Sequence, residues 1–155
     1  MQLEYEIISL IVLIALSGFF SGLEVALVGT TRSKVRQMMN EKLPGAISLD
    51  KLKSNPSRMM ASVNLGNNLV NVASTALATD IALKMFESAG LAIVIGVMTF
   101  LILVFGEITP KTYCNANAAK IALRYSRVLL AFSYAFYPIV WMFEKIAKGI
   151  INLTG

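Results

Sequence analysis

Three long apolar runs constrain this sequence more than any other feature. They extend from Ile7 to about Thr31, from Met59 to about Leu83, and from about Ala89 to Phe105. A bilayer core of roughly 30 Å requires about 20 helical residues, so each run can cross it. The runs lack the two-residue alternation of barrel strands, and lipid otherwise tolerates only helices. The sequence therefore predicts an all-α integral membrane protein with three transmembrane helices. We place these helices at about residues 5–31, 59–84 and 89–113.

The composition supports a membrane setting and excludes several kinds of site. Charged residues make up 15% of the chain and hydrophobic residues 56%, whereas soluble domains carry about 25% charged residues. There is one cysteine, Cys114, and no histidine. These counts exclude an internal disulfide, a Cys/His zinc site and histidine acid/base catalysis. The first run has no basic residue before it, so we interpret it as a retained helix and not a cleaved signal peptide.

Two further function classes fit poorly. The net charge of +5 resides between the apolar runs, and no basic stretch with aromatics suited to stacking bases is present, so we expect no nucleic-acid partner. The spans also lack the Ser/Lys, Asp/Asp and HExxH arrangements of intramembrane enzymes. We therefore expect a protein that is not an enzyme.

The charged residues predict an orientation in the membrane. Residues 32–58 hold seven basic and two acidic side chains, residues 108–127 hold four basic and no acidic ones, and the N-terminus carries only Glu4 and Glu6. Basic loops stay cytoplasmic. We expect a cell-membrane protein with an extracellular N-terminus and a cytoplasmic loop at 32–58. The turn near Glu87 and Ser88 would then be outside. Short helices are expected within the loop at 33–40 and 46–53.

The last apolar stretch, Val128 to Phe143, allows two interpretations. It is 16 residues long, contains Pro138 and includes six aromatic residues. A fourth span would place the C-terminus outside, whereas an interfacial helix would leave it in the cytoplasm. Short length and aromatic density favour the interface. We therefore divide the chain into a three-span domain at 1–124 and a juxtamembrane belt helix at 125–155.

Each predicted span carries an oxygen-rich stripe. Helical spacing places Ser17, Ser21 and Glu24 on one face of the first span. It does the same for the polar residues of the second span, and the third span ends in Gly106-Glu107. At 1.5 Å per residue all three stripes fall in the inner half of the bilayer, so they can meet. The polar residues of the second span are Asn64, Asn67, Asn68, Asn71 and Thr75.

Pro110 leaves a backbone carbonyl of the third stripe free to bind an ion. A proline has no N–H to donate to the carbonyl four residues earlier, and here that carbonyl belongs to Gly106. Freed backbone at membrane depth is tolerated where it lines a polar cavity, and transporters use such carbonyls to coordinate ions. The Glu107 carboxylate lies directly beside it. Gly66, beside Asn67, is a second place where a cation can approach the backbone closely.

The ligand chemistry suits a hard cation. Hydroxyl, amide, carbonyl and carboxylate oxygens are ligands for Mg²⁺, and Na⁺ accepts hydroxyls and carbonyls as well. Small and polar residues also mediate helix packing, which is the alternative for the serines. Glu24 has three open roles: it joins the site, makes a polar contact or pairs with a basic residue. Lys111 pairs with an acid or reaches the headgroups.

Three motifs together resemble one known family. SGFFSGLEVAL (17–27), NLGNNLVNVAS (64–74) and GEITPKTYCNANA (106–118) are similar to the signature stretches of the cyclin M / CorC magnesium transporter transmembrane domain. The resemblance implies a homodimer with three spans per subunit, a belt helix, and a Mg²⁺ site that opens to the cytoplasm. It also implies Mg²⁺ export coupled to Na⁺ entry. The family motifs map onto Ser21, Gly66, Asn67, Asn71, Gly106 and Glu107 as metal-site residues. Asn68 is also within reach, and the sequence does not choose among the asparagines. We expect supporting roles for Ser17, Glu24, Pro110 and Lys111.

One departure from the family concerns regulation. Family members usually continue into a paired CBS nucleotide-binding module, whereas this sequence ends at Gly155. We therefore expect an isolated transmembrane domain, with a cytoplasmic CBS-type domain in the full-length protein. An alternative function uses the same residues: a membrane cation sensor or scaffold that binds the ion without transporting it.

Overall fold

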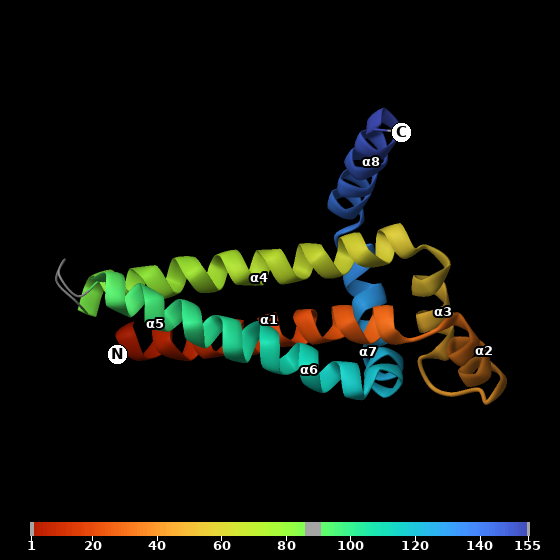
Figure 1. Ribbon diagram of the computed structural model, residues 1–155, viewed down its shortest axis with the longest axis horizontal. Coiled ribbons are helices and arrows are strands. Elements are labelled where there is room, and N and C mark those ends of the chain that lie inside the picture. The colour runs from red at the N-terminus through yellow and green to blue at the C-terminus, as the bar shows by residue number, and fades with distance from the viewer. Residues whose placement is uncertain (1, 86–90, 155) are drawn as a thin grey trace.

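The structure, a computed structural model, describes residues 2–85 and 91–154, and all regular secondary structure in these ranges is helical. Three long helical segments lie side by side (Figure 1). They are α1 (Gln2–Gly29), α4 (Pro56–Met85) and a composite of α5 (Leu91–Leu103), η1 (Val104–Ile108) and α6 (Thr109–Ala116). The turn expected near Glu87 and Ser88, like the expected start of the third helix at Ala89, lies outside the described residues.

Two of these segments are apolar and long enough to cross a membrane, namely Leu3–Gly29 and Ala92–Ala116. α4 has 30 residues, about 45 Å of helix at 1.5 Å per residue, but it carries more polar side chains. It runs alongside α1 and α5 through the bundle (Figure 1), and on this ground we assign it as the second of the three spans in chain order. The prediction of an all-α membrane protein is confirmed.

Two glycines allow α1 and α6 to approach closely. A Cβ atom added to Gly18 would lie 2.8 Å from Cγ of Pro110, and one added to Gly22 would lie 2.5 Å from Sγ of Cys114. Both glycines are buried. Small residues four positions apart are a common device for close helix contacts in membranes. The contact holds the segment that follows Glu107 against the face of α1 that carries the serines.

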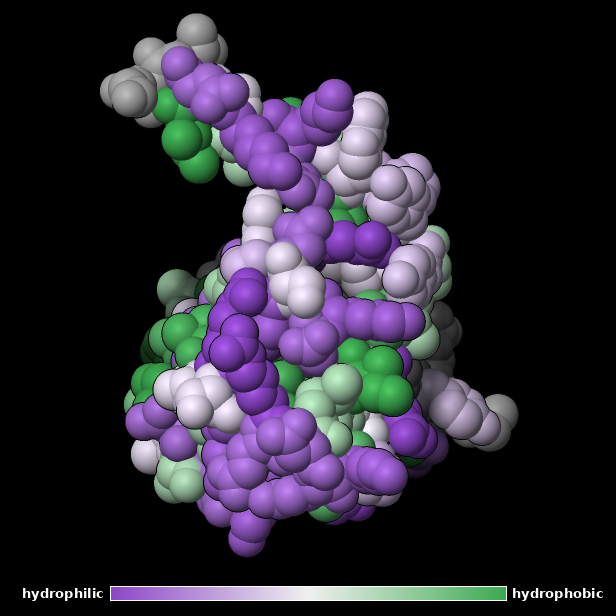
Figure 2. Space-filling model, turned by 90° about the vertical axis from the view of Figure 1, so that its right-hand side faces the viewer, coloured by the Kyte–Doolittle hydropathy of each residue, from purple (hydrophilic) through white to green (hydrophobic). Residues whose placement is uncertain are grey.

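The loop between α1 and α4 folds into two short helices, α2 (Arg32–Asn40) and α3 (Ala46–Ser54), close to the predicted positions. The Thr31 hydroxyl accepts the Lys34 N–H at 3.2 Å and caps α2. Gly45 precedes α3 with φ +95°, a conformation that favours glycine. Figure 2 looks onto this end of the bundle, where hydrophilic side chains gather.

The stretch predicted as one belt helix at 125–155 contains two helices, the first of which begins before residue 125. The structure has two helices, α7 (Ala118–Ala135) and α8 (Tyr137–Thr154), which meet at Phe136 with a bend of 85°. Pro138 accounts for the break in part, because it has no N–H to donate to the carbonyl four residues earlier, in the last turn of α7. By composition the pair could form one broken span. However, both helices lie across the direction of the three long ones (Figure 1), as a belt would.

The belt is attached to the polar end of the bundle. The Ser126 hydroxyl on α7 donates a hydrogen bond to the Gly45 carbonyl at 2.9 Å. Beneath this contact, one apolar core joins α1, the loop helices, α4 and α7. Its fully buried members include Leu27, Leu49 and Leu129. Burial of such side chains contributes about 1.5–3 kcal/mol each, so the loop helices and α7 form a fixed platform beneath the spans.

Candidate cation site

Ser17 is the residue at which the three long helical segments meet. Its side chain is 1% exposed. Its hydroxyl donates to Oδ1 of Asn71 on α4 and to the carbonyl oxygen of Gly106 on η1, the latter at 3.2 Å. A hydroxyl carries a single proton, so three oxygen atoms from three segments share one proton. An arrangement rich in oxygen and poor in protons is what a hard cation needs.

A second pair extends this contact by one turn. The Ser21 hydroxyl, which is fully buried, donates to Oδ1 of Asn67 at 3.0 Å. Ser21 and Asn67 stand four residues from Ser17 and Asn71 on their helices, so the two pairs lie one above the other. We name Ser17, Ser21, Asn67, Asn71 and Gly106 the oxygen layer. The predicted meeting of the three stripes therefore occurs in the structure through these five residues.

The Gly106 carbonyl owes its position to a wide helical turn. Residues Val104–Ile108 form a π-helix, in which the Thr109 N–H bonds to the carbonyl of Val104 five residues earlier. The helix therefore widens before Pro110 and continues to Ala116, and does not stop at the proline. Single π-turns within α-helices occur frequently at functional sites. Gly106 is buried, and a Cβ there would lie 3.2 Å from the Ser17 hydroxyl.

The carboxylates lie in a separate cluster. Nζ of Lys111 lies 2.8 Å from Oε1 of Glu107 and 3.8 Å from Oε2 of Glu24. We name these three residues the Lys111 cluster. Of the roles considered for Glu24, the structure shows the ion pair, and it places Lys111 against an acid. Glu24 and Lys111 also line an open hollow of about 330 Å³. Eight of the predicted site residues thus divide into a neutral layer of five and a charged cluster of three, which are adjacent because Glu107 follows Gly106 in the chain.

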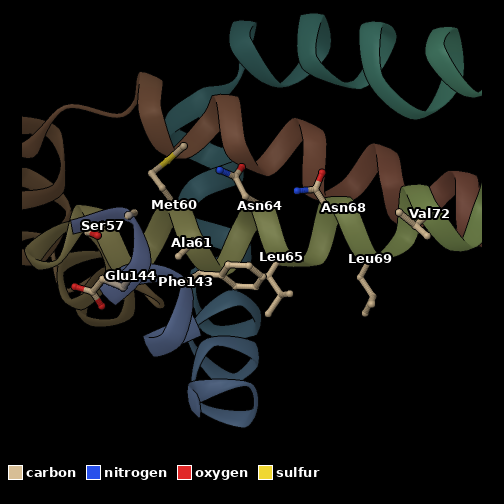
Figure 3. A pocket seen from close by; sticks show the side chains of 11 residues that line it. Ser57, Met60, Ala61, Asn64, Leu65, Asn68, Leu69, Val72, Phe143 and Glu144 are labelled. Carbon is tan, nitrogen blue, oxygen red and sulfur yellow. The ribbon is translucent and has the colours of Figure 1, made fainter. Parts of the chain in front are cut away.

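Asn68 does not belong to the oxygen layer. The asparagines were expected to share one face of α4, but Asn64 and Asn68 are exposed whereas Asn67 is buried. Successive helical residues differ by about 100° in direction, since an α-helix has 3.6 residues per turn. Figure 3 shows Asn64 and Asn68 one turn apart at a hollow of about 580 Å³ between α4 and α8. Phe143 of α8 lies in the same hollow.

Gly66 has a packing role in the structure. It is buried, and a Cβ atom added there would overlap the ring of Phe20 on α1. Phe20 in turn makes edge contact with Phe19, at 5.3 Å between ring centres. The glycine therefore allows the Phe20 ring to lie against α4, with Gly66 and Phe20 each directly preceding a residue of the oxygen layer, Asn67 and Ser21.

The donor types limit what the site can bind. Within the part of the chain that the structure describes, no three His, Cys, Asp or Glu side chains lie together as a metal-binding group. Any ion held here must therefore rely on neutral oxygens with help from Glu107 or Glu24. The sequence alone predicts only a supporting role for Ser17. Its spacing of four residues from Ser21 was the available signal, but spacing alone did not show which serine reaches both other segments.

The sequence matches a known family over nearly the whole chain. The family described as the cyclin M transmembrane N-terminal domain matches residues 8–155. This chain belongs to that family. The cyclin M assignment agrees with the resemblance carried by the three motifs, and each motif contributes at least one residue to the oxygen layer.

Several curated relatives share this cyclin M domain. A UPF0053 protein of Haemophilus influenzae is 34% identical over 148 residues, which covers 96% of this chain and 35% of the relative. The UPF0053 inner membrane protein YfjD of Escherichia coli is 34% identical, covering 90% and 33%. A chloroplastic DUF21 domain-containing protein of Arabidopsis thaliana is 35% identical, covering 94% and 22%. The chain therefore spans about a third or less of the length of these relatives.

Proposed function

We propose that this cyclin M domain exports Mg²⁺ from the cytoplasm, coupled to Na⁺ entry. The observation that carries the proposal is the convergence of the Ser17, Asn71 and Gly106 oxygens at the π-turn. These neutral oxygens are supplied by three different segments, so a movement of any one segment changes the coordination of an ion held between them. A site of this kind is suited to release an ion as well as to bind it.

Glu107 supplies the charge in this proposal. Mg²⁺ sites in proteins commonly use one or two carboxylates, and the ion keeps several waters. In the structure Glu107 is neutralised by Lys111 at 2.8 Å, and its backbone neighbour Gly106 already lies in the oxygen layer. Rotation of the Glu107 side chain away from Lys111 and toward the layer would place a carboxylate among the neutral oxygens. Soft metals prefer sulfur ligands, so an all-oxygen set of ligands binds them weakly.

The direction of access follows from the distribution of charge. The seven basic side chains of residues 32–58 lie in or beside the polar end shown in Figure 2, and basic segments stay in the cytoplasm. The Lys111 cluster and its hollow involve the last turns of α1 and the first of α6, toward this end. We therefore propose an inward-opening site, an extracellular N-terminus and a cytoplasmic C-terminus.

A homodimer forms the second part of the proposal. Asn64 and Asn68 are exposed on α4, within a segment that we assign to the membrane. Polar side chains facing hydrocarbon without partners are costly. A second copy of the chain packed against this face of α4, with water between them, would remove that cost. The longer relatives leave room for a cytoplasmic CBS-type regulatory domain in the full-length protein.

Flux and binding measurements separate transport from the alternative of a cation sensor or scaffold. The protein is reconstituted into liposomes, Mg²⁺ movement is followed with an internal dye under an imposed Na⁺ gradient, and Mg²⁺ binding is measured by calorimetry. The proposal predicts Mg²⁺ flux that depends on the direction of the Na⁺ gradient. Saturable Mg²⁺ binding without flux would support the sensor and contradict the transporter.

A further inference from the structure

A hollow of about 340 Å³ lies between α3, the start of α4 and α7, away from the oxygen layer. Its apolar wall includes Leu52, Met59 and Leu130, and its polar wall includes Lys51 and Arg58. Among the described residues that line it there is no Asp or Glu. We name it the α3–α7 pocket. It joins two basic side chains to an apolar surface.

Among the described residues, the contacts that hold the Arg58 guanidinium are all to neutral groups. Its guanidinium carbon lies 4.7 Å from the ring centre of Tyr134 and 4.8 Å from that of Tyr137. Its Nε donates to the Ser133 hydroxyl at 3.0 Å, and Nη2 contacts the Ser133 carbonyl at 3.4 Å. Cation–π contacts and neutral hydrogen bonds fix a guanidinium without cancelling its charge. The arrangement orients a positive charge at the pocket.

No carboxylate compensates the charge of the pocket. Across residues 2–85 and 91–154, neither Lys51 nor Arg58 takes part in an ion pair. The pocket also borders the N-terminus of α4, where Asn55 Oδ1 accepts the backbone N–H of Arg58 at 3.1 Å. The last turn of α3, which also lines the pocket, ends in a helix C-terminus of opposite partial charge, so the two helix ends offset each other. The positive potential of the pocket therefore comes from Lys51 and Arg58, which have no carboxylate partner among the described residues.

The pocket lies where a membrane surface would meet the bundle. It is built from the polar end and from α7, which lies across the long helices (Figure 1). Val128 and Tyr134 of α7 and Tyr137 and Trp141 of α8 are exposed. Exposed aromatic rings of this kind concentrate at the headgroup level. A ligand in the pocket can thus contact the basic groups and the surrounding lipid at once.

We propose that the α3–α7 pocket binds the phosphate of an anionic phospholipid headgroup. Lys51 and Arg58 contact the phosphate, and an acyl chain leaves along the exposed apolar surface of α7. Basic pockets beside transmembrane helices on the cytoplasmic side are a general mode of recognition for anionic headgroups. Charge complementarity selects an anionic lipid over a zwitterionic one. The inference does not depend on the cation site, because no residue is shared between them.

Lipid titrations followed by native mass spectrometry test this inference. The whole chain in detergent is titrated with phosphatidylglycerol or phosphatidylcholine. We expect phosphatidylglycerol to bind at least fivefold more tightly. Lys51→Gln should weaken its binding about fivefold, since one basic residue near a membrane surface contributes about 1 kcal/mol. Lys51 is exposed, so this variant should fold. Arg58→Gln should weaken binding further, and its folding is checked by circular dichroism.

Arg36→Gln is the matched control, because Arg36 is an exposed basic residue of α2 that does not line the pocket. Unchanged phosphatidylglycerol binding in this control, together with loss in Lys51→Gln, supports the site. Equal losses in the two variants would contradict it and indicate attraction by net charge alone. Equal binding of the two lipids would also contradict it. Displacement of the lipid by millimolar inorganic phosphate would show an anion site that does not require a lipid, and would overturn the lipid assignment.

Discussion

The Ser17 hydroxyl lies 3.2 Å from the Gly106 carbonyl, although the two residues are 89 positions apart in the chain. The same hydroxyl bonds to Asn71. Ser17 therefore connects the first span to the second and to the π-turn of the third. The proposed transport cycle depends on this connection, because an ion bound to the Ser17, Asn71 and Gly106 oxygens would be held by all three segments.

Ser17→Ala should reduce Mg²⁺ flux at least tenfold in proteoliposomes. The variant leaves Asn71 and Gly106 without their shared donor and removes one oxygen of the layer. The free energy of unfolding should fall by only about 1 kcal/mol, the usual net contribution of one hydrogen bond. Ser9→Ala is the control, since the Ser9 hydroxyl bonds only to the Tyr5 carbonyl on an exposed face of the same helix. Equal flux in the two variants would remove Ser17 from the site.

Lys111→Met should tighten Mg²⁺ binding about fivefold, measured by calorimetry in detergent. The Lys111 ammonium pairs with the Glu107 carboxylate and therefore competes with Mg²⁺ for it. A partly exposed ion pair contributes up to about 1 kcal/mol, which corresponds to about fivefold in affinity. Lys148→Met removes a comparable pair with Glu144 on α8 and should leave the affinity unchanged. Weaker binding in Lys111→Met would mean that the lysine positions Glu107 for the ion and does not compete with it.

Gly66→Ala should lower the free energy of unfolding by about 1–3 kcal/mol, the usual cost of overpacking. The new methyl group would overlap the Phe20 ring. Gly96→Ala is the matched control, because nothing lies within 4 Å of a Cβ there, and alanine in a helix interior is favoured by up to about 1 kcal/mol. Adding Phe20→Leu to Gly66→Ala should restore part of the thermal stability. A stable Gly66→Ala variant that loses Mg²⁺ binding would instead support direct approach of the ion to this backbone.

Asn68→Cys, in a Cys114→Ala background, should form a crosslinked dimer with a short thiol reagent in membranes. The prediction follows from the exposure of Asn68 on α4. Ile11→Cys provides the comparison, since Ile11 is 61% exposed on α1 and is apolar, so lipid can cover it without a partner. Crosslinking of both variants, or of Ile11→Cys alone, would place the dimer contact elsewhere.

The polar stripes and the effect of Pro110 could be predicted from the sequence because both depend on local geometry. Helical spacing fixes which residues share a face of one helix, and a proline always lacks an N–H. Spacing does not fix how a helix is rotated against its neighbours. For this reason the polar stripe predicted on α4 includes too many residues. Asn67 and Asn71 bond to serines of α1, whereas Asn64 and Asn68 are exposed.

The π-turn and the bend at Phe136 could not be predicted with the same rules. A proline indicates a disturbed helix, but the result depends on the surrounding contacts. At Pro110 the helix widens and continues, held by the contacts with Gly18 and Ser17. At Pro138 it bends by 85°, where Arg58 packs against Tyr134 and Tyr137 on the two sides of the break. Both outcomes depend on residues far apart in the chain.

The initial rate of Mg²⁺ flux in proteoliposomes carrying Glu107→Ala tests the central claim most directly. Glu144→Ala is measured beside it, because Glu144 is a carboxylate of α8 that pairs with Lys148 and lies outside the oxygen layer. Equal incorporation and circular dichroism spectra are required for both variants. We expect Glu107→Ala to abolish Mg²⁺ flux and Glu144→Ala to retain it. Wild-type flux in Glu107→Ala would contradict the assignment of the π-turn carboxylate as the charge that binds the transported ion.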